Sequence, residues 1–260
     1  MADASLRVEV KDAVATVLID RPERKNALSV AVANGLADAW ERIEADPAIR
    51  VAILTSSDCG IFSAGLDLKE AQEIAAREGV DILSKMRDPF HDIMRNVSKP
   101  IIAAMTGSLM AGGMMLALNC DLRVGLAGTK AGITEVKVGR GSPWAAPALS
   151  MLPQPILMEM LLTGELMPIE ALHHYGFTNY IEKTPDAVRA RARLLADRIV
   201  AGAPLSVKAA KASLRATMDL GCSAGIEEGK RLHAEVYASL DAIEGPKAFA
   251  EKRLPVWQGR

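Results

Sequence analysis

The sequence predicts an α/β protein with a largely parallel sheet, followed by a helical C-terminal region. Three short apolar runs, residues 51–55, 101–105 and 122–126, have the composition of strands buried on both faces of a sheet. Helical patterns separate these runs, and helical crossovers connect parallel strands. After about residue 150 only helical segments follow, several with proline in the first turn.

The individual elements follow from local signals. Residues 6–10 and 14–20 alternate around Lys11-Asp12 and predict a hairpin. Ser29 opens a helix to about residue 45, where Asp46-Pro47 ends it. Apolar periodicity predicts further helices over 67–77, 80–96, 112–119, 155–163, 168–175, 185–200, 204–219 and 223–240.

Composition restricts the class of protein. A chain of 260 residues is long enough to form its own core without a disulfide or a metal. Its net charge is −1 and aromatic residues make up 4%, so nucleic acid is not an expected partner. Residues 100–120 carry no charge, but polar residues and glycines interrupt them, so we expect a buried strand, loop and helix and no membrane span.

The N-terminus shows no secretory signal, and the three cysteines form no Cys-x-x-Cys pair. We therefore expect a cytoplasmic protein whose cysteines are small buried thiols. The sequence also lacks a Gly-x-Ser-x-Gly elbow, a His-Glu-x-x-His motif and a Gly-x-Gly-x-x-Gly after a strand. No metal site is predicted.

Two glycine-bearing turns, residues 63–67 and 110–114, each lie between a strand and a helix. A helix N-terminus has unpaired N–H groups, and glycine lets a ligand approach the backbone closely. If two such turns lie side by side, two backbone N–H groups can donate hydrogen bonds to one oxygen of a ligand, as in an oxyanion hole. Taken alone, the residues also fit two ordinary strand-to-helix turns.

Several motifs together resemble the crotonase superfamily of enoyl-CoA hydratases and isomerases. The resemblance covers nearly the whole chain, in order and at the family's spacing. Its motifs are Asp20-Arg-Pro-x-x-x-Asn-Ala-Leu28, Phe62-Ser-Ala-Gly-Leu-Asp-Leu68, Lys99-Pro-Ile-Ile-Ala-Ala104, Ala111-Gly-Gly113, Cys120-Asp-Leu-Arg123, Glu135-Val-Lys-Val-Gly139 and the tail from Phe249 to Arg260.

The resemblance implies a spiral of β-β-α repeats over residues 1–195, which would hold an acyl-CoA site. Residues 196–260 would be a helical trimerisation region, in a homotrimer or a homohexamer. The ligand would be an acyl-CoA thioester, with no cofactor beyond the coenzyme A of the substrate. The backbone N–H groups of Leu66 and Gly112 would form the oxyanion hole. The remaining substrate-binding positions implied are Ala64, Gly65, Asp67 and Leu68 along the pantetheine path, and Arg24, Lys25 and Ala27 near the nucleotide.

The acid–base residues decide the reaction. A two-carboxylate hydratase of this family has one glutamate after its glycine cluster and a second before the next loop. Here Met115 stands at the first position and Glu135 at the second. One carboxylate can carry a proton between C2 and C4 of an acyl chain, which is the pattern of a Δ3,Δ2-enoyl-CoA isomerase.

Two details favour the isomerase further. Ala111-Gly-Gly113 resembles the isomerase motif, and Pro143, followed by Trp144, stands eight residues after Glu135. Arg140-Gly-Ser142 departs from the apolar stretch expected in an isomerase.

Hydration, thioester hydrolysis, decarboxylation and ring chemistry stay open, as does a catalytically silent subunit that binds CoA thioesters. Asp67 is expected to cap a helix, and Trp144 is either a pocket wall or core.

Overall fold

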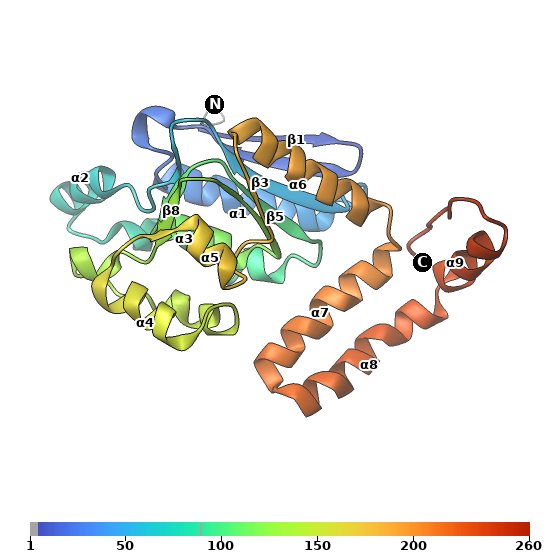
Figure 1. Cartoon of the computed structure of the whole chain (residues 1–260). Coiled ribbons are helices and arrows are strands. Elements are labelled where there is room, and N and C mark those ends of the chain that lie inside the picture. The colour runs from blue at the N-terminus through green and yellow to red at the C-terminus, as the bar shows by residue number, and fades with distance from the viewer. Residues whose placement is uncertain (1–4, 89) are drawn as a thin grey trace.

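The computed structural model describes residues 5–88 and 90–260 as two sheets surrounded by helices (Figure 1). The larger sheet has the order β1-β2-β3-β5-β7-β10; β1 pairs antiparallel with β2, and the other pairs are parallel. Its strands are β1 (Leu6–Lys11), β2 (Val14–Ile19), β3 (Val51–Ser56), β5 (Ile101–Met105), β7 (Leu122–Leu126) and β10 (Tyr180–Glu182).

The smaller sheet has the order β4-β6-β8-β9. Its strands are β4 (Ile61–Ser63), β6 (Ser108–Met110), β8 (Lys130–Gly132) and β9 (Met167–Pro168). β3, β5 and β7 of the large sheet are each followed directly by β4, β6 and β8 of the small one. Helices α2 (Leu68–Glu78) and α3 (Gly112–Asn119) then follow β4 and β6, so the chain repeats a β-β-α unit.

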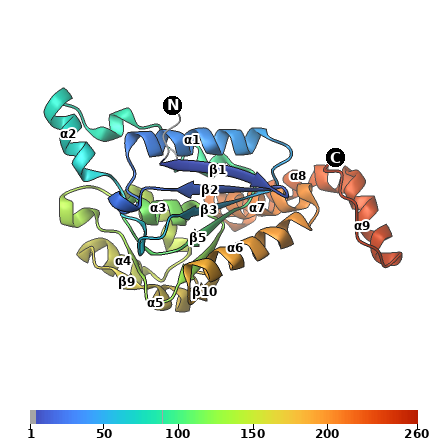
Figure 2. The same ribbon diagram turned by 90° about the horizontal axis from the view of Figure 1, so that it is seen from above.

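Helices cover both faces of the larger sheet (Figure 2). On one face α1 (Val30–Ala45) buries Leu36, Trp40 and Ile43, and the Ser29 hydroxyl caps it by accepting the Val32 N–H at 3.1 Å. On the other face α6 (Pro185–Val200) buries Val188, Ala192, Leu195 and Ala196 against β3, β5 and β7. The expected division after residue 195 falls inside α6.

The last helices, α7 (Pro204–Leu220), α8 (Cys222–Ala238) and α9 (Leu240–Ala250), extend away from the sheets (Figure 1). α7 and α8 pack against each other, and α7 contacts the core where Lys211 Nζ lies 2.6 Å from Asp121 Oδ2. We call α7–α9 and the following tail the C-terminal arm.

The remaining elements are short. They are the helices α4 (Gln154–Thr163) and α5 (Ile169–His174) and the 3₁₀ turns η1 (Pro22–Arg24), η2 (Ile82–Lys85), η3 (Met94–Asn96), η4 (Glu135–Val138) and η5 (Pro143–Ser150). The uncharged run 100–120 forms a strand and a helix, β5 and α3, as predicted, and the predicted loop between them contains the short strand β6. Along the described chain, no helix is long and apolar enough to cross a membrane.

The helix predicted over residues 80–96 is wrong. Gly79, with φ 69°, ends α2, and the helical turns in the described part of residues 80–96 are η2 and η3. The carboxylate of Asp81 accepts the Leu83 N–H, and that of Asp88 accepts the Phe90 N–H, so side chains take backbone donors in turns.

The prediction of three buried thiols is also wrong, because Cys59 and Cys222 are exposed. Only Cys120 is buried. Burial raises the pKa of the Cys120 thiol to about 12, which keeps it protonated and unreactive.

Candidate active site

The two predicted glycine turns lie against each other because β4 and β6 are parallel neighbours. A Cβ on Gly65 would lie 2.9 Å from the backbone nitrogen of Gly112 and 3.0 Å from Met110 O, and φ at Gly65 is 81°. A Cβ on Gly113 would lie 2.5 Å from Ser63 O. Only glycine allows the two backbones to come this close.

The hydrogen bonds around Leu28 show which way the Leu66 N–H points. Leu28 donates its N–H to Gly65 O at 2.8 Å and accepts the Asp67 N–H at 3.0 Å, so it forms a parallel bridge opposite Leu66. In such a bridge the middle residue's own N–H points to the other side. In the described part of the chain the Leu66 N–H has no acceptor.

The Gly112 N–H also has no acceptor among the described residues, for a different reason. Gly112 is the first residue of α3, where an N–H has no acceptor within the helix. Ala111 before it has φ 50° and ψ −123°, an uncommon conformation for an L-residue that costs about 1–3 kcal/mol. This strained turn reverses the chain between β6 and α3 and presents the Gly112 N–H.

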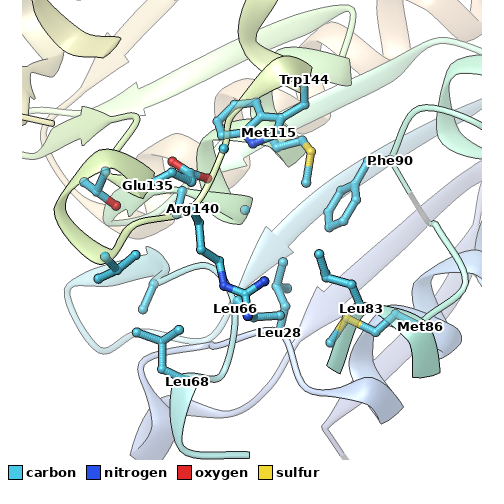
Figure 3. A pocket seen from close by; sticks show the side chains of 16 residues that line it. Leu28, Leu66, Leu68, Leu83, Met86, Phe90, Met115, Glu135, Arg140 and Trp144 are labelled. Carbon is cyan, nitrogen blue, oxygen red and sulfur yellow. The ribbon is translucent and has the colours of Figure 1, made fainter. Parts of the chain in front are cut away.

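Both turns border one cavity of about 190 Å³ (Figure 3). Its wall is mostly apolar, and the charged side chains lining it are Glu135 and Arg140. The lining residues are Leu28, Ala64, Leu66, Leu68, Leu83, Met86, Phe90, Ala111, Gly112, Met115, Thr134, Glu135, Val138, Arg140, Gly141 and Trp144.

Glu135 begins η4 and is 8% exposed. Its Oε2 is buried and has no hydrogen-bond partner within residues 5–88 and 90–260. Burial raises the pKa of Glu135 above the usual value for glutamate, against smaller opposing hydrogen bonds from its own backbone, the Trp144 side chain and the Thr134 backbone. A buried carboxylate of raised pKa is a stronger base toward a carbon acid.

The structure brings seven of the predicted site residues to this cavity: Ala64, Leu66, Leu68, Gly112, Met115, Glu135 and Trp144. Trp144 is therefore a wall of the pocket. The other five do not line the cavity. Gly65 and Asp67 belong to the 63–67 turn, Arg24 and Lys25 contact it, and Ala27 precedes Leu28, which bridges Leu66.

Asp67 holds that turn in place. Its side chain caps α2 by accepting the Glu70 N–H at 3.2 Å, as predicted, and pairs with Arg24 at 2.8 Å and Arg21 at 3.3 Å. Burial acts to raise the pKa of Asp67, but the hydrogen bonds from Arg24 and Glu70 and the arginine charges outweigh it, so the pKa is lowered. Lys25 is exposed, and its carbonyl accepts the Ala64 N–H at 3.1 Å.

Sequence reasoning missed one wall of the cavity. Leu83, Met86 and Phe90 come from the segment wrongly predicted as a helix, and Leu28 and Val138 were not singled out. Arg140 lines the cavity where the sequence departs from the apolar pattern of an isomerase, so a signal for it was present. Among the described residues, no three His, Cys, Asp or Glu side chains gather as a metal-binding group.

Comparison with known proteins identifies the family. The sequence model of the enoyl-CoA hydratase/isomerase family matches residues 9–260. The chain belongs to this family. It is 36% identical to an (E)-benzylidenesuccinyl-CoA hydratase of Thauera aromatica, over 97% of this chain and 98% of that one. A carnitinyl-CoA dehydratase of Proteus mirabilis is 34% identical, over 98% and 99% of the two chains.

Solved structures confirm the crotonase fold. An enoyl-CoA hydratase of Mycobacterium tuberculosis H37Rv matches with a TM-score of 0.87 and 34% identity, over 99% of this chain and all of that one. One from Bacillus anthracis matches with a TM-score of 0.90 and 25% identity, over 98% and 100% of the chains. The protein is thus an acyl-CoA enzyme of the enoyl-CoA hydratase/isomerase family.

Proposed function

We propose that the enzyme moves a double bond from C3 to C2 of an enoyl-CoA thioester, with Glu135 as the proton carrier. One observation carries this proposal: among the described residues that line the cavity, Glu135 has the single carboxyl side chain, and Met115 stands where the family resemblance places the other carboxylate. A chemistry with one proton carrier fits this wall best.

A single acid–base group is enough for the proposed steps, because it takes up one proton and gives one back. The Glu135 carboxylate removes a proton from C2, and the electron pair passes through the conjugated system to the thioester oxygen. The N–H groups of Leu66 and Gly112 stabilise the resulting dienolate oxygen, which is where charge develops. Glu135, now protonated, delivers the same proton to C4, and the double bond is left between C2 and C3.

The remaining predicted residues are proposed to serve coenzyme A. Residues 64–68 would border the pantetheine, while Arg24, Lys25 and Ala27 would lie near the nucleotide. Support comes from Asp67, which pairs with Arg24 and caps α2 and so fixes both segments to each other.

Hydration of a 2-enoyl-CoA is the second candidate. It is favoured by the names of two relatives, a hydratase and a dehydratase that are 36% and 34% identical to this chain. The absence of a second carboxylate from the described cavity wall disfavours it, because a water held between two acid–base groups needs both.

The test uses a 3-enoyl-CoA in heavy water. Isomerisation should give 2-enoyl-CoA, and deuterium should enter C4 of the product and C2 of the remaining substrate to the extent that protonated Glu135 exchanges its proton with heavy water before delivering it. Glu135→Gln should lower kcat about 10²–10⁴-fold, the usual scale of general acid–base catalysis, and leave acyl-CoA affinity nearly unchanged. Rapid hydration of 2-enoyl-CoA without isomerisation would favour the second candidate, and CoA-thioester binding without any turnover would indicate a silent subunit.

We also propose that the C-terminal arm assembles the enzyme into a trimer or a hexamer. Large apolar side chains stand exposed along it, which is typical of surfaces that pack against other chains. They are Leu214, Met218, Leu220, Ile226, Tyr237, Leu240, Ile243, Phe249, Leu254 and Val256.

A further inference from the structure

Arg140 is the cationic side chain among the residues that line the cavity. Figure 3 shows it extending into the hollow with its guanidinium end inward, among the apolar side chains of the wall. It is 33% exposed. A guanidinium beside apolar groups is unfavourable unless an anion pairs with it.

The backbone fixes Arg140 next to Glu135. Gly139, with φ 67°, ends η4, and both Gly139 and Arg140 donate their N–H groups to Glu135 O, Arg140 at 3.0 Å. Glu135 and Arg140 therefore belong to one tight turn, and the side chains of both line the same cavity.

Asp81, the ion-pair partner of Arg140, accepts a hydrogen bond from only one of the guanidinium nitrogens. Nη2 lies 2.8 Å from Asp81 Oδ2, while Asp81 Oδ1 accepts the Leu83 N–H at 2.9 Å. Asp81 is 49% exposed, so this pair sits at the edge of the cavity. Within residues 5–88 and 90–260, Nε and Nη1 have no hydrogen-bond acceptor, and no ion pair joins Arg140 to Glu135.

A plain fatty acyl chain does not match this wall, because it would lie against donors that it cannot satisfy. A carboxylate matches it well, since two oxygens can accept two parallel N–H bonds from the fork of a guanidinium. We propose that the acyl group of the substrate carries a second carboxylate, and that Arg140 binds it. This inference rests on the proposed function in one respect: the cavity holds the acyl group.

Saturated acyl-CoA pairs of matched length test the proposal by binding alone. Butanoyl-CoA and succinyl-CoA form one pair, and hexanoyl-CoA and adipoyl-CoA the other; none contains a C3 double bond to migrate. Titration calorimetry should show tighter binding of the dicarboxylic member in at least one pair. Arg140→Met should reduce that preference about 10- to 100-fold and leave the monocarboxylic member nearly unchanged.

Three controls separate recognition from a structural role. Arg140→Lys keeps the charge but loses the fork, so it should restore part of the preference. Asp81→Asn removes the competing anion, so the preference for the dicarboxylic acyl-CoA should stay the same or become stronger. Free coenzyme A should bind wild type and Arg140→Met alike. The proposal is overturned if wild type shows no preference in either pair, or if Arg140→Met weakens all acyl-CoAs and free coenzyme A equally.

The binding test for the carboxylate site can succeed or fail whether or not the enzyme isomerises an enoyl-CoA. If the preference is absent but 3-hexenoyl-CoA is isomerised through Glu135, this inference fails and the proposed function stands. If the preference is present but neither 3-hexenoyl-CoA nor 3-hexenedioyl-CoA is isomerised, the proposed function fails and the carboxylate site stands.

Discussion

Gly112→Pro removes one backbone N–H from the cavity and keeps the others. Gly112 is the first residue of α3, where proline fits the helix and the lost N–H breaks no helical hydrogen bond. The added Cβ would lie 2.9 Å from Leu28 Cδ1, the end of a flexible side chain. Gly112→Ala adds the same Cβ but keeps the N–H, so it is the matched control.

The two variants share the added Cβ, while proline also removes the donor, places its Cδ where the N–H hydrogen lay and restricts the strained Ala111 before it. Crowding of Leu28 costs about 1–3 kcal/mol of stability in both. Loss of one oxyanion donor lowers kcat about 10²–10³-fold, or roughly 3–4 kcal/mol of transition-state stabilisation. We therefore expect Gly112→Pro to be about 10²–10³-fold slower than Gly112→Ala with a saturating 3-enoyl-CoA.

The assay pairs kcat with thermal unfolding of both variants, so that a distorted turn is recognised. The donor role of Gly112 would be refuted by equal kcat values in two variants that both fold and both bind acyl-CoA. A loss in Gly112→Ala as large as in Gly112→Pro would assign the effect to Leu28 and the shape of the cavity.

Three further predictions concern single features. Because burial raises the pKa of Glu135 in the folded protein, the folded state loses stability as pH rises through that pKa. Glu135→Gln should melt higher than wild type at neutral pH, with the difference shrinking toward pH 4.5, the usual glutamate pKa; a pH-independent difference would contradict this. Met115→Glu should raise hydration of crotonyl-CoA relative to isomerisation, whereas wild-type hydration as fast as isomerisation would show that the two reactions are ranked wrongly. Light scattering should give the mass of a trimer or hexamer, reduced by Phe249→Glu with Leu254→Glu, and a monomeric wild type would exclude the proposed assembly.

Sequence patterns predicted the long and self-contained elements of the fold. The buried strands 51–55, 101–105 and 122–126 were found because each is a continuous apolar run, and α3 was placed over its full length by its glycines and the following strand. The strands of the smaller sheet were missed because two or three residues are too few to show a period. Their pairing is set by contacts far along the chain.

The residues of the candidate site likewise divide into those that sequence signals predicted and those that depend on distant contacts. Glycines marked the two turns locally, whereas Glu135 was singled out by the family resemblance, and its burial is visible only in the structure. The wall formed by Leu83, Met86 and Phe90 could not be foreseen, because turns capped by Asp81 and Asp88 replace the helix that the apolar spacing favoured. The inward direction of Arg140 depends on the positive φ of Gly139 and on Asp81, which is far away in sequence.

A structure of the enzyme with a bound acyl-CoA tests the central claim most directly. The thioester oxygen should lie about 2.7–3.1 Å from both the Leu66 and the Gly112 nitrogens, the geometry of an oxyanion hole, with a Glu135 carboxylate oxygen facing C2 and C4. A thioester oxygen distant from both nitrogens, in a complex of folded and active enzyme, would contradict the assignment of these residues.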